Sequence, residues 1–385
     1  GHSSCSSVSW ACSSASATSS SISSASRLKI KVRHIVLSIL VVFVLSARFS
    51  ASIGEWYSTA VYPLISAALS WLVSWIPFSL EEIAVIALCG FMVCLIVYCI
   101  RQRVGLWKTF LRITELLLWI YVWVYIAWGC NYFRADLYTR TGSERQAYDE
   151  SVFKDFVRAY TDSLNAAYAS FKEDEEGVGL EQTDLEAYVK QAYSEVPDTY
   201  GLSVPRPWQH PKDVLLKNLY SSVGVLGYMG PFFCETQLNP DLLPDQYPFI
   251  YAHEYSHLMG VSNEDEANYW AYVICIASDS PEVRYSGYYS LLPYVLSNAI
   301  RALTETDYRE LLRTIHPDIL AQYSQERDYW NSLYSSFLGK IQSAIYNAFL
   351  KGNKIPSGTA NYLEVIDMII SIPSALDSPL PITQD

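Results

Sequence analysis

Two histidines and a glutamate carry the clearest chemistry in the sequence: His253, Glu254 and His257 form a His-Glu-x-x-His motif. Pro248 suits the first turn of a helix and Gly260 suits the position just past its end, so we expect the motif on a helix. Side chains four residues apart project from the same face of a helix, where two neutral imidazoles can share one zinc ion. Glu254 lies about 100° around the helix from His253, so it can reach a water molecule on the metal and act as the general base.

A catalytic zinc ion needs a third protein ligand and an open position. The chain restarts after the motif at Asn263, which can cap a new helix. Glu264 would lie in the first turn of that helix, and Asn268, one turn later, can hydrogen-bond a ligand histidine. Glu266 would point to another side of the helix and is the alternative third ligand. The predicted ligands of one zinc ion per chain are therefore His253, His257 and Glu264, with Glu254 as the catalytic residue.

Composition separates the chain into a membrane part and a globular part. The 385 residues are 51% hydrophobic and only 17% charged, whereas soluble domains are about 25% charged. Residues 1–26 form a Ser-rich leader that lacks the apolar side chains of a core, and we expect it to be disordered. Three apolar runs in the membrane domain, residues 27–130, predict transmembrane helices. They cover residues 35–53, 83–100 and 110–130.

The charges of the loops predict the topology. Residues 56–80 carry no charge and could form either a fourth span or a helix in the membrane interface. With three spans, the basic loop at residues 101–108 lies on the same side as the basic N-terminal cluster, as the positive-inside rule requires. We therefore predict three spans, an interfacial segment at residues 56–80, a cytoplasmic N-terminus and residues 131–385 outside the cell. In the third span, Arg112 and Glu115 are three residues apart and can form an ion pair.

The globular part, residues 131–385, contains 18 basic and 35 acidic residues, a net charge of −17. Phosphate binding needs a basic surface, so this charge argues against nucleic acid as a partner. A Gly-punctuated apolar segment around Phe232 and Phe233 predicts a short strand or hairpin. Thr183 and Glu186 match a capping box that would open a helix. The expected helices of this part cover about residues 151–171, 183–196, 282–303, 307–315, 318–349 and 360–372.

Beyond these patterns, the sequence resembles known zinc peptidases. His-Glu-x-x-His followed by a helix that opens Glu-x-x-Ala-Asn resembles the gluzincins, which pair the motif with a glutamate in a following helix. More closely, HEYSHLMGVSNEDEANYWAY is similar to the bacterial membrane family called domain of unknown function 3810. The similarity runs from about Arg27 to Ile372 and includes GPFFCETQLN and the tail YNAFLKGNKIPSGTANYLEVIDMII. That family is regarded as membrane zinc peptidases with undefined substrates.

The resemblance implies a mainly α fold: three transmembrane helices, then a mostly helical extracytoplasmic zincin-like (gluzincin) domain with a small β-sheet or hairpin at the active-site cleft. The strand before the motif helix, Phe232–Leu238, would form the edge of that cleft. Glu235 in this strand could meet a substrate amine, although a surface charge or a structural hydrogen-bond acceptor is the simpler interpretation. Glu254 would take a proton from water activated by zinc, and this water would attack a peptide carbonyl. Gluzincin oxyanion donors are usually His or Tyr, and Tyr362 is the candidate for this role.

The chain is therefore expected to be a membrane-anchored zinc metallopeptidase that acts on peptides or proteins outside the cytoplasm. Its partners would be the lipid bilayer and a peptide or protein substrate. The alternative is a non-catalytic zinc-binding membrane protein on the same scaffold, such as a sensor or an assembly partner. Proteolysis within the membrane is disfavoured, because the motif lies more than 120 residues beyond the last span in acidic sequence.

Overall fold

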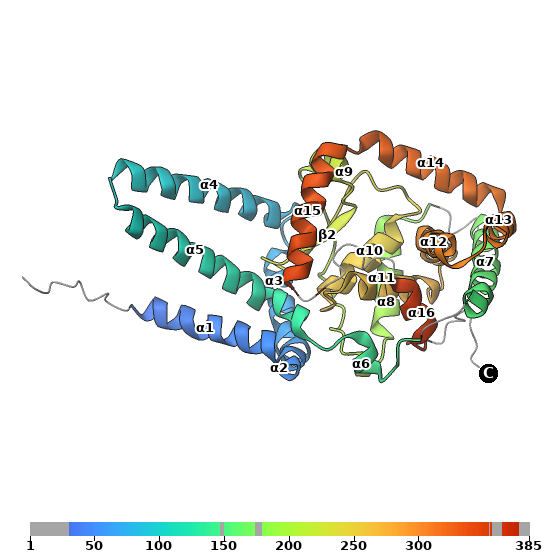
Figure 1. Cartoon of the computed structure of the whole chain (residues 1–385), viewed down its shortest axis with the longest axis horizontal. Helices are drawn as coiled ribbons and strands as arrows, with labels where there is room; N and C mark the ends of the chain where they lie inside the picture. The colour runs from blue at the N-terminus through green and yellow to red at the C-terminus, as the bar shows by residue number, and fades with distance from the viewer. Residues whose placement is uncertain (1–30, 147–149, 174–178, 354, 356–363, 377–385) are drawn as a thin grey trace, which may run out of the picture.

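The computed structural model describes residues 31–146, 150–173, 179–353, 355 and 364–376. The chain is mainly helical and contains one three-stranded sheet. Figure 1 shows an arm of long helices that extends from one side of a larger body. The leader at residues 1–26 and Tyr362 lie outside the described residues, so the predictions made for them stay predictions.

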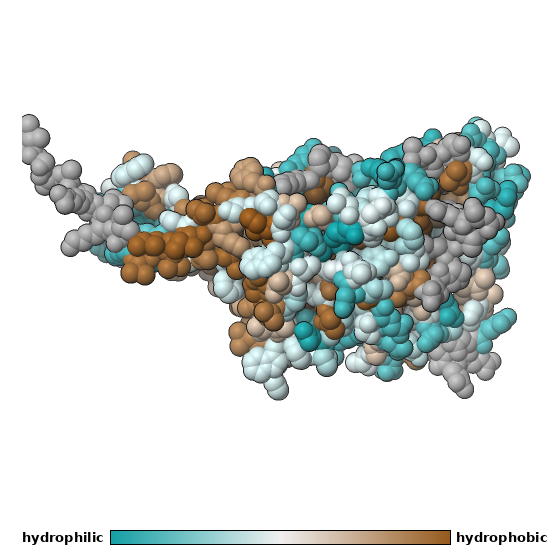
Figure 2. Space-filling model, turned by 90° about the horizontal axis from the view of Figure 1, so that it is seen from below, coloured by the Kyte–Doolittle hydropathy of each residue, from teal (hydrophilic) through white to brown (hydrophobic). Residues whose placement is uncertain are grey.

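Three helices form the arm: α1 (Val32–Phe49), α4 (Leu80–Arg101) and α5 (Leu106–Ala127). Each is long and apolar enough to cross a membrane, with mean hydropathies of 1.9, 2.9 and 1.6. At 1.5 Å per residue, a 22-residue helix is about 33 Å long, which matches the hydrocarbon core of a bilayer. On the face seen in Figure 2, hydrophobic residues predominate along the arm and continue onto the adjoining rim of the body. The prediction of three apolar spans is confirmed.

Two of the spans end earlier than predicted. Ser50 is extended, and its hydroxyl accepts a hydrogen bond from N of Ile53, so Ser50 caps a new helix and α1 stops at Phe49. The third span stops at Ala127 because Trp128, with φ of −154°, departs from helical geometry. A short 3-10 helix follows it.

The predicted ion pair between Arg112 and Glu115 is wrong. Glu115 instead pairs with Arg33 of α1, whose Nε lies 2.8 Å from Oε1 of the carboxylate. Nη1 of Arg112 lies 3.8 Å from Sγ of Cys99 in α4. Because α1 and α4 both contact α5, neighbouring helices supply partners at both positions.

The segment between the first two arm helices forms α2 (Ala51–Trp56), the π-helical turn η1 (Tyr57–Val61) and α3 (Tyr62–Val73). With 12 residues, α3 is too short to cross a bilayer. Its inner face is tied to the body, since Oη of Tyr62 donates to O of Leu258 at 2.9 Å. This arrangement suits the interfacial position predicted for residues 56–80. Large exposed apolar side chains of the segment are Trp56, Leu64, Trp71, Leu72, Trp75 and Phe78.

The body is built around three packed helices: α10 (Tyr247–Leu258), α11 (Glu264–Ile276) and α12 (Pro281–Ala302). All 13 residues of α11 are buried, because α10 and α12 both pack against it. Outside them lie α7 (Glu150–Glu173), α8 (Gln182–Ser194) and α16 (Val365–Ser371). The remaining helical segments are η2 (Gly129–Phe133), α6 (Leu137–Thr141), η3 (Asp198–Tyr200), α9 (Lys217–Val223), α13 (Glu305–Thr314), α14 (Pro317–Leu333) and α15 (Ser336–Gly352).

The sheet consists of β1 (Lys212–Asp213), β2 (Gly227–Gly230) and β3 (Glu235–Leu238), in the order β1-β3-β2. β1 runs parallel to β3, and β2 runs antiparallel to it with Gly227 opposite Leu238. The predicted hairpin is therefore present, but Phe232 and Phe233 lie in its turn. Cys234 has φ of 53°, a turn conformation, so strand pairing begins only at the residue that follows it.

The first turn of α4 joins the arm to the sheet. Oε2 of Glu81 accepts a hydrogen bond from N of Phe232, and N of Glu81 donates to Oε2 of Glu235, both at 2.9 Å. The Glu82 carboxylate accepts hydrogen bonds from the backbone amides of residues 215–216. Carboxylates of a membrane helix thus hold two loops of the body. Arm and body also share one hydrophobic core.

The expected helix over residues 318–349 is two helices, α14 and α15. They are separated by Tyr334 and Ser335, which have extended backbones. N of Ser335 donates to O of Ser222 at 2.8 Å, so the chain pairs with α9 here and changes direction.

The predicted capping box at the start of α8 is absent. The helix begins after Glu181, and Glu186 is buried, where it accepts a hydrogen bond from Oη of Tyr247 at 3.0 Å. Its carboxylate is therefore not free to bond the helix N-terminus. The other expected helices match α7, α12 and α13 to within two residues at each end. The described part of the last one begins at Val365.

Candidate metal centre

A tight connection lays α11 onto α10 and brings their polar faces together. Pro248 stands in the first turn of α10. Gly260 has φ of 99°, in the left-handed region that favours glycine, and it directs the chain back over α10. Oδ1 of Asn263 then accepts hydrogen bonds from N of Asp265 at 2.8 Å and N of Glu266 at 3.4 Å. The predicted cap is thus confirmed, and it sets where the first turn of α11 starts.

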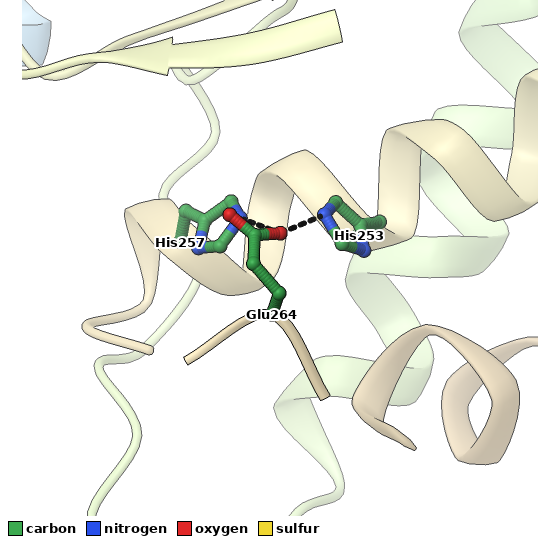
Figure 3. Close-up of side chains that lie close together, drawn as sticks. All are labelled: His253, His257 and Glu264. Carbon is green, nitrogen blue, oxygen red and sulfur yellow. Dashed lines mark ion pairs between the residues drawn. The ribbon is translucent and has the colours of Figure 1, made fainter. Parts of the chain in front are cut away.

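This connection brings together His253, His257 and Glu264. Oε2 of Glu264 lies 3.2 Å from Nε2 of His253 and 3.5 Å from Nε2 of His257. Figure 3 shows the Glu264 carboxylate between the two imidazole rings. One potential ligand atom from each residue lies within 4.8 Å of the others. Among the described residues, this is the group of metal-ligating side chains that stands out by its geometry.

The other nitrogen of each imidazole is held by a hydrogen bond. Nδ1 of His257 lies 2.9 Å from the carbonyl oxygen of Val261. Nδ1 of His253 lies 2.9 Å from Oδ1 of Asn268, the residue predicted to orient a ligand histidine. In the neutral form of each ring, these acceptors place the proton on Nδ1 and leave the Nε2 lone pair directed at Glu264.

These residues fit a zinc ion. Two nitrogen lone pairs and a carboxylate converge on one point. These electron-rich groups repel one another unless a cation or protons lie between them. Zinc ligands about 2.1 Å from the metal in a tetrahedral site stand about 3.4 Å apart, and the two measured separations, 3.2 and 3.5 Å, lie on either side of that value. His253, His257 and Glu264 would hold the ion. Two imidazoles and one carboxylate form a donor set that zinc uses in catalytic sites.

Glu254 lies beside this group without joining it. Its side chain is buried against β2, where a Cβ atom on Gly227 would come within 2.8 Å of Cγ of Glu254. Glycine is therefore required at this position of β2 for the strand to approach the motif helix so closely. Within the described part of the chain, Oε2 of Glu254 has no hydrogen-bond partner. Burial raises the pKa of Glu254 to about 7, against the opposing charges of His253 and His257.

Burial and neighbouring charges shift the pKa values of His257 and Glu264 in opposite directions. Burial alone would lower the pKa of His257, but the carboxylates of Glu264 and Glu254 outweigh it and raise that pKa to about 9. Burial would raise the pKa of Glu264, but His257 and His253 hold it well below its usual range. Without a metal, the chain thus favours a positive imidazole beside a negative carboxylate. A metal cation bound between them would take the place of the imidazole proton.

Glu266, the alternative third ligand, points away from both histidines. Its carboxylate pairs with Arg140 and accepts a hydrogen bond from Nε1 of Trp270 at 3.2 Å. Both members of the Arg140–Glu266 pair are buried. The geometry therefore favours Glu264 over Glu266 as the residue that could complete the site.

Two residues near the site were not predicted from the sequence. Oη of Tyr346, from α15, donates a hydrogen bond to Oε1 of Glu264. Nε1 of Trp128, just past α5, donates to O of His257 at 2.9 Å, and its ring stands edge-on to the imidazole at 6.1 Å. Tyr346 is 82 residues from Glu264, and Trp128 is 129 from His257. No local pattern connects such distant segments, so only the fold could identify them.

The cleft edge predicted at Phe232–Leu238 needs correction. β3, which contains most of that segment, is the central strand of the sheet, and β2 is the strand that packs against Glu254. Glu235 is not a surface charge, because it is buried and its carboxylate accepts hydrogen bonds from Nζ of Lys212 and Nε2 of Gln237. It is a structural acceptor.

A family model described as "Protein of unknown function (DUF3810)" matches residues 57–370. The chain belongs to the DUF3810 family. The match includes both helices of the candidate metal centre, the sheet and α15. No curated protein and no solved structure matches the DUF3810 chain. The family description carries no activity, so the function of the site must be argued from its own geometry.

Proposed function

We propose that this DUF3810 protein is a membrane-anchored, zinc-dependent metallopeptidase of the gluzincin type. One observation carries the proposal: Nε2 of His253, Nε2 of His257 and Oε2 of Glu264 converge beside the buried carboxylate of Glu254. In metallopeptidases, a His-Glu-x-x-His helix holds the metal through its histidines and uses the glutamate as the general base.

A zinc ion held there would polarise a water molecule and the carbonyl oxygen of a peptide bond. Glu254 removes a proton from the water as the water oxygen bonds to the carbonyl carbon. When the carbon–nitrogen bond breaks, Glu254 returns that proton to the amine that leaves. The unpartnered Oε2 of Glu254 supports this role, because that oxygen has no hydrogen-bond partner among the described residues.

The sheet supports a peptide as the substrate. β2 is at the edge of the sheet and, within the described residues, pairs with β3 on one side. An extended peptide can add to such an edge by backbone hydrogen bonds. Because Gly227 of β2 touches Glu254, a peptide on this edge would run past the general base.

The arm supports a position at the membrane. The N-terminal end of α1 and the loop between α4 and α5 lie at the far end of the arm from the body (Figure 1). Lys31, Arg33, Arg101, Arg103 and Lys108 belong to that end. The positive-inside rule would place it in the cytoplasm and the body outside the cytoplasm. The proposed substrate is therefore an extracytoplasmic peptide or protein.

A second candidate is a non-catalytic zinc-binding membrane protein, and one observation favours it. The side chains of the candidate site are deeply enclosed: His253, Glu254, His257 and Glu264 are at most 8% exposed. Tyr346 also covers Glu264 through its hydrogen bond. A sensor or assembly partner that holds zinc permanently would need no more access than this.

Metal content and hydrolysis, measured on the same full-length preparations, separate the two candidates. The wild type, Glu254→Gln and His257→Ala are purified in detergent, freed of loosely bound metal, and incubated with a mixture of fluorescence-quenched peptides. The peptidase proposal expects about one zinc ion per chain and hydrolysis in the wild type, and zinc without hydrolysis in Glu254→Gln. Zinc in the wild type with no hydrolysis in any preparation supports the non-catalytic candidate. A folded wild type that binds no zinc overturns both.

A further inference from the structure

Helix α15 presents two different faces. One face, formed by Gly339, Gln342, Tyr346 and Leu350, is turned toward the body, and Tyr346 reaches Glu264 from it. The opposite face is exposed although it is apolar. Its large exposed side chains are Phe337, Leu338, Ile341 and Ile345, and Phe349 lies at its edge, where its half-exposed ring also packs against Tyr132. A helix with one apolar face in contact with water would be unfavourable, so this face needs a cover.

The C-terminal end of α15 lies where the arm helices leave the membrane. Nη2 of Arg48, next to the last residue of α1, donates to O of Gly352 at 2.9 Å. Oη of Tyr125, near the end of α5, donates to Oδ1 of Asn353 at 2.5 Å. Arginine and tyrosine at the ends of spans sit at the membrane–water boundary. These two bonds therefore place the end of α15 at that boundary.

The N-terminal end of α15 lies at the same level. N of Ser335 donates to O of Ser222 in α9 at 2.8 Å. The chain just before α9 is bonded in turn to Glu82, in the first turn of α4, through the amides of residues 215–216. Leu219 of α9 is exposed. Because both ends of α15 are tied to the starts and ends of spans, its axis runs along the plane of the membrane surface.

The charges of α15 also suit a lipid surface. Lys340 and Lys351 are its charged residues, and it has no carboxylate, although the globular part around it has a net charge of −17. In Figure 1 the helix crosses the rim of the body from which the arm extends. Lysines beside an apolar face reach toward phospholipid headgroups, whereas carboxylates would be repelled by anionic ones.

We propose that α15 is an interfacial helix that lies on the same phospholipid bilayer that holds the arm. Its apolar face is embedded at the boundary between headgroups and acyl chains, about 5–10 Å deep. Its inner face simultaneously carries Tyr346 to the candidate metal centre. The bilayer is favoured over a second copy of the chain because the apolar face continues the surface of the spans at both ends of the helix.

Fluorescence quenching in nanodiscs tests this contact on the full chain. Cys5, Cys12, Cys89 and Cys94, which are exposed or outside the described residues, are replaced by alanine. A single cysteine is then introduced as Ile345→Cys, and as Ile300→Cys for a matched control on α12. These isoleucines are 67% and 64% exposed. Each is labelled with the same environment-sensitive dye.

The label at position 345 is expected to lose intensity with lipids that carry a nitroxide near the headgroup, and to resist quenching by aqueous iodide. The label at position 300 is expected to behave in the opposite way. Quenching of the 345 label by iodide as strong as at position 300 would overturn the proposal, because the face would then be in water. Protection from both quenchers would also overturn it, because a second copy or another protein would then cover the face. An unchanged Tm of the labelled chains checks that they are folded.

Discussion

The carbonyl oxygen of Val261 lies 2.9 Å from Nδ1 of His257 and decides which ring nitrogen carries the proton. A carbonyl can only accept a hydrogen bond, so Nδ1 of the neutral ring must donate. Nε2 then presents its lone pair to Glu264, 3.5 Å away. The turn that connects the two helices thus fixes the orientation of the His257 nitrogen that, in the neutral ring, could bind a metal.

Glu254→Gln keeps the size of the side chain but removes its ability to accept a proton. We expect zinc content to be unchanged and peptide hydrolysis to fall by about 100-fold or more, the range for loss of a general base. Zinc analysis and the peptide assay measure the two effects. Glu326→Gln, in α14, alters a glutamate that accepts hydrogen bonds from Tyr289 and Gln246 and is not part of the His253, His257 and Glu264 group, so it should retain activity. Equal activity in wild type and Glu254→Gln would contradict the assigned role.

His257→Ala removes one predicted ligand and should abolish stoichiometric zinc binding. Because a bound ion stabilises the folded state, by about 2.7 kcal/mol at 100 times its Kd, a chelator should lower the Tm of the wild type. It should not change the Tm of His257→Ala. His316→Ala, on an exposed histidine that caps α14, should show the same chelator-induced fall in Tm as the wild type. A chelator effect of the same size in His257→Ala would show that the zinc binds elsewhere.

Asn268→Ala removes the hydrogen bond that orients His253. Loss of a partner that holds a ligand histidine typically weakens metal binding by about 10–100-fold, so zinc affinity should fall by this factor while some binding persists. Competition with a chromophoric chelator measures it. Asn165→Ala removes an amide that bonds O of Thr314 at 2.7 Å, far from the site. If both variants lose affinity equally, Asn268 has no specific role.

Gly227→Ala tests the contact between β2 and the motif helix. The added methyl would lie 2.8 Å from Cγ of Glu254 and 3.0 Å from O of Gln237, so the strand or the glutamate must move. A displacement of about 1 Å can cost 100-fold in rate, and we expect hydrolysis to fall by about that factor with zinc retained. Gly90→Ala in α4, with nothing within 4 Å of the added Cβ, is the control. Full activity in Gly227→Ala would mean that β2 can yield without disturbing Glu254.

Arg140→Met concerns stability rather than catalysis. It leaves Glu266 buried without its ionic partner, a change that typically costs about 3–5 kcal/mol. Thermal unfolding should therefore occur at a markedly lower temperature. The double variant Arg140→Met/Glu266→Gln removes the unpaired charge and should recover part of the loss. No recovery in the double variant would show that the packing of Arg140 matters more than its charge.

The sequence predicted the parts of the protein that depend on local patterns. Apolar runs located the three spans, and helix periodicity placed His253 and His257 on one face. The four-residue spacing of Glu264 and Asn268 placed both on the side of α11 that meets α10. The structure places Glu264 and Asn268 beside His253. The roles of Glu264 as a metal ligand and of Asn268 as an orienting residue stay predictions.

Contacts between segments that lie far apart in the sequence could not be predicted from local patterns. Tyr346 lies in a segment expected as one long helix, and its approach to Glu264 depends on the break at Tyr334 and Ser335. Arg112 and Glu115 have suitable spacing, but helices α1 and α4 supply nearer partners. The spacing of residues in the sequence shows which contacts are possible, and tertiary packing determines which of them form.

The hydrogen bonds of Glu81 and Glu82 have a practical consequence for anyone who wishes to study the body as a soluble fragment. A chain that starts after residue 130 would lack the carboxylates that accept from the amides of Phe232 and residues 215–216. It would also lose Tyr62, which bonds O of Leu258 at the end of the motif helix. Expression of the full chain in a membrane mimetic is therefore the sounder route to an intact site.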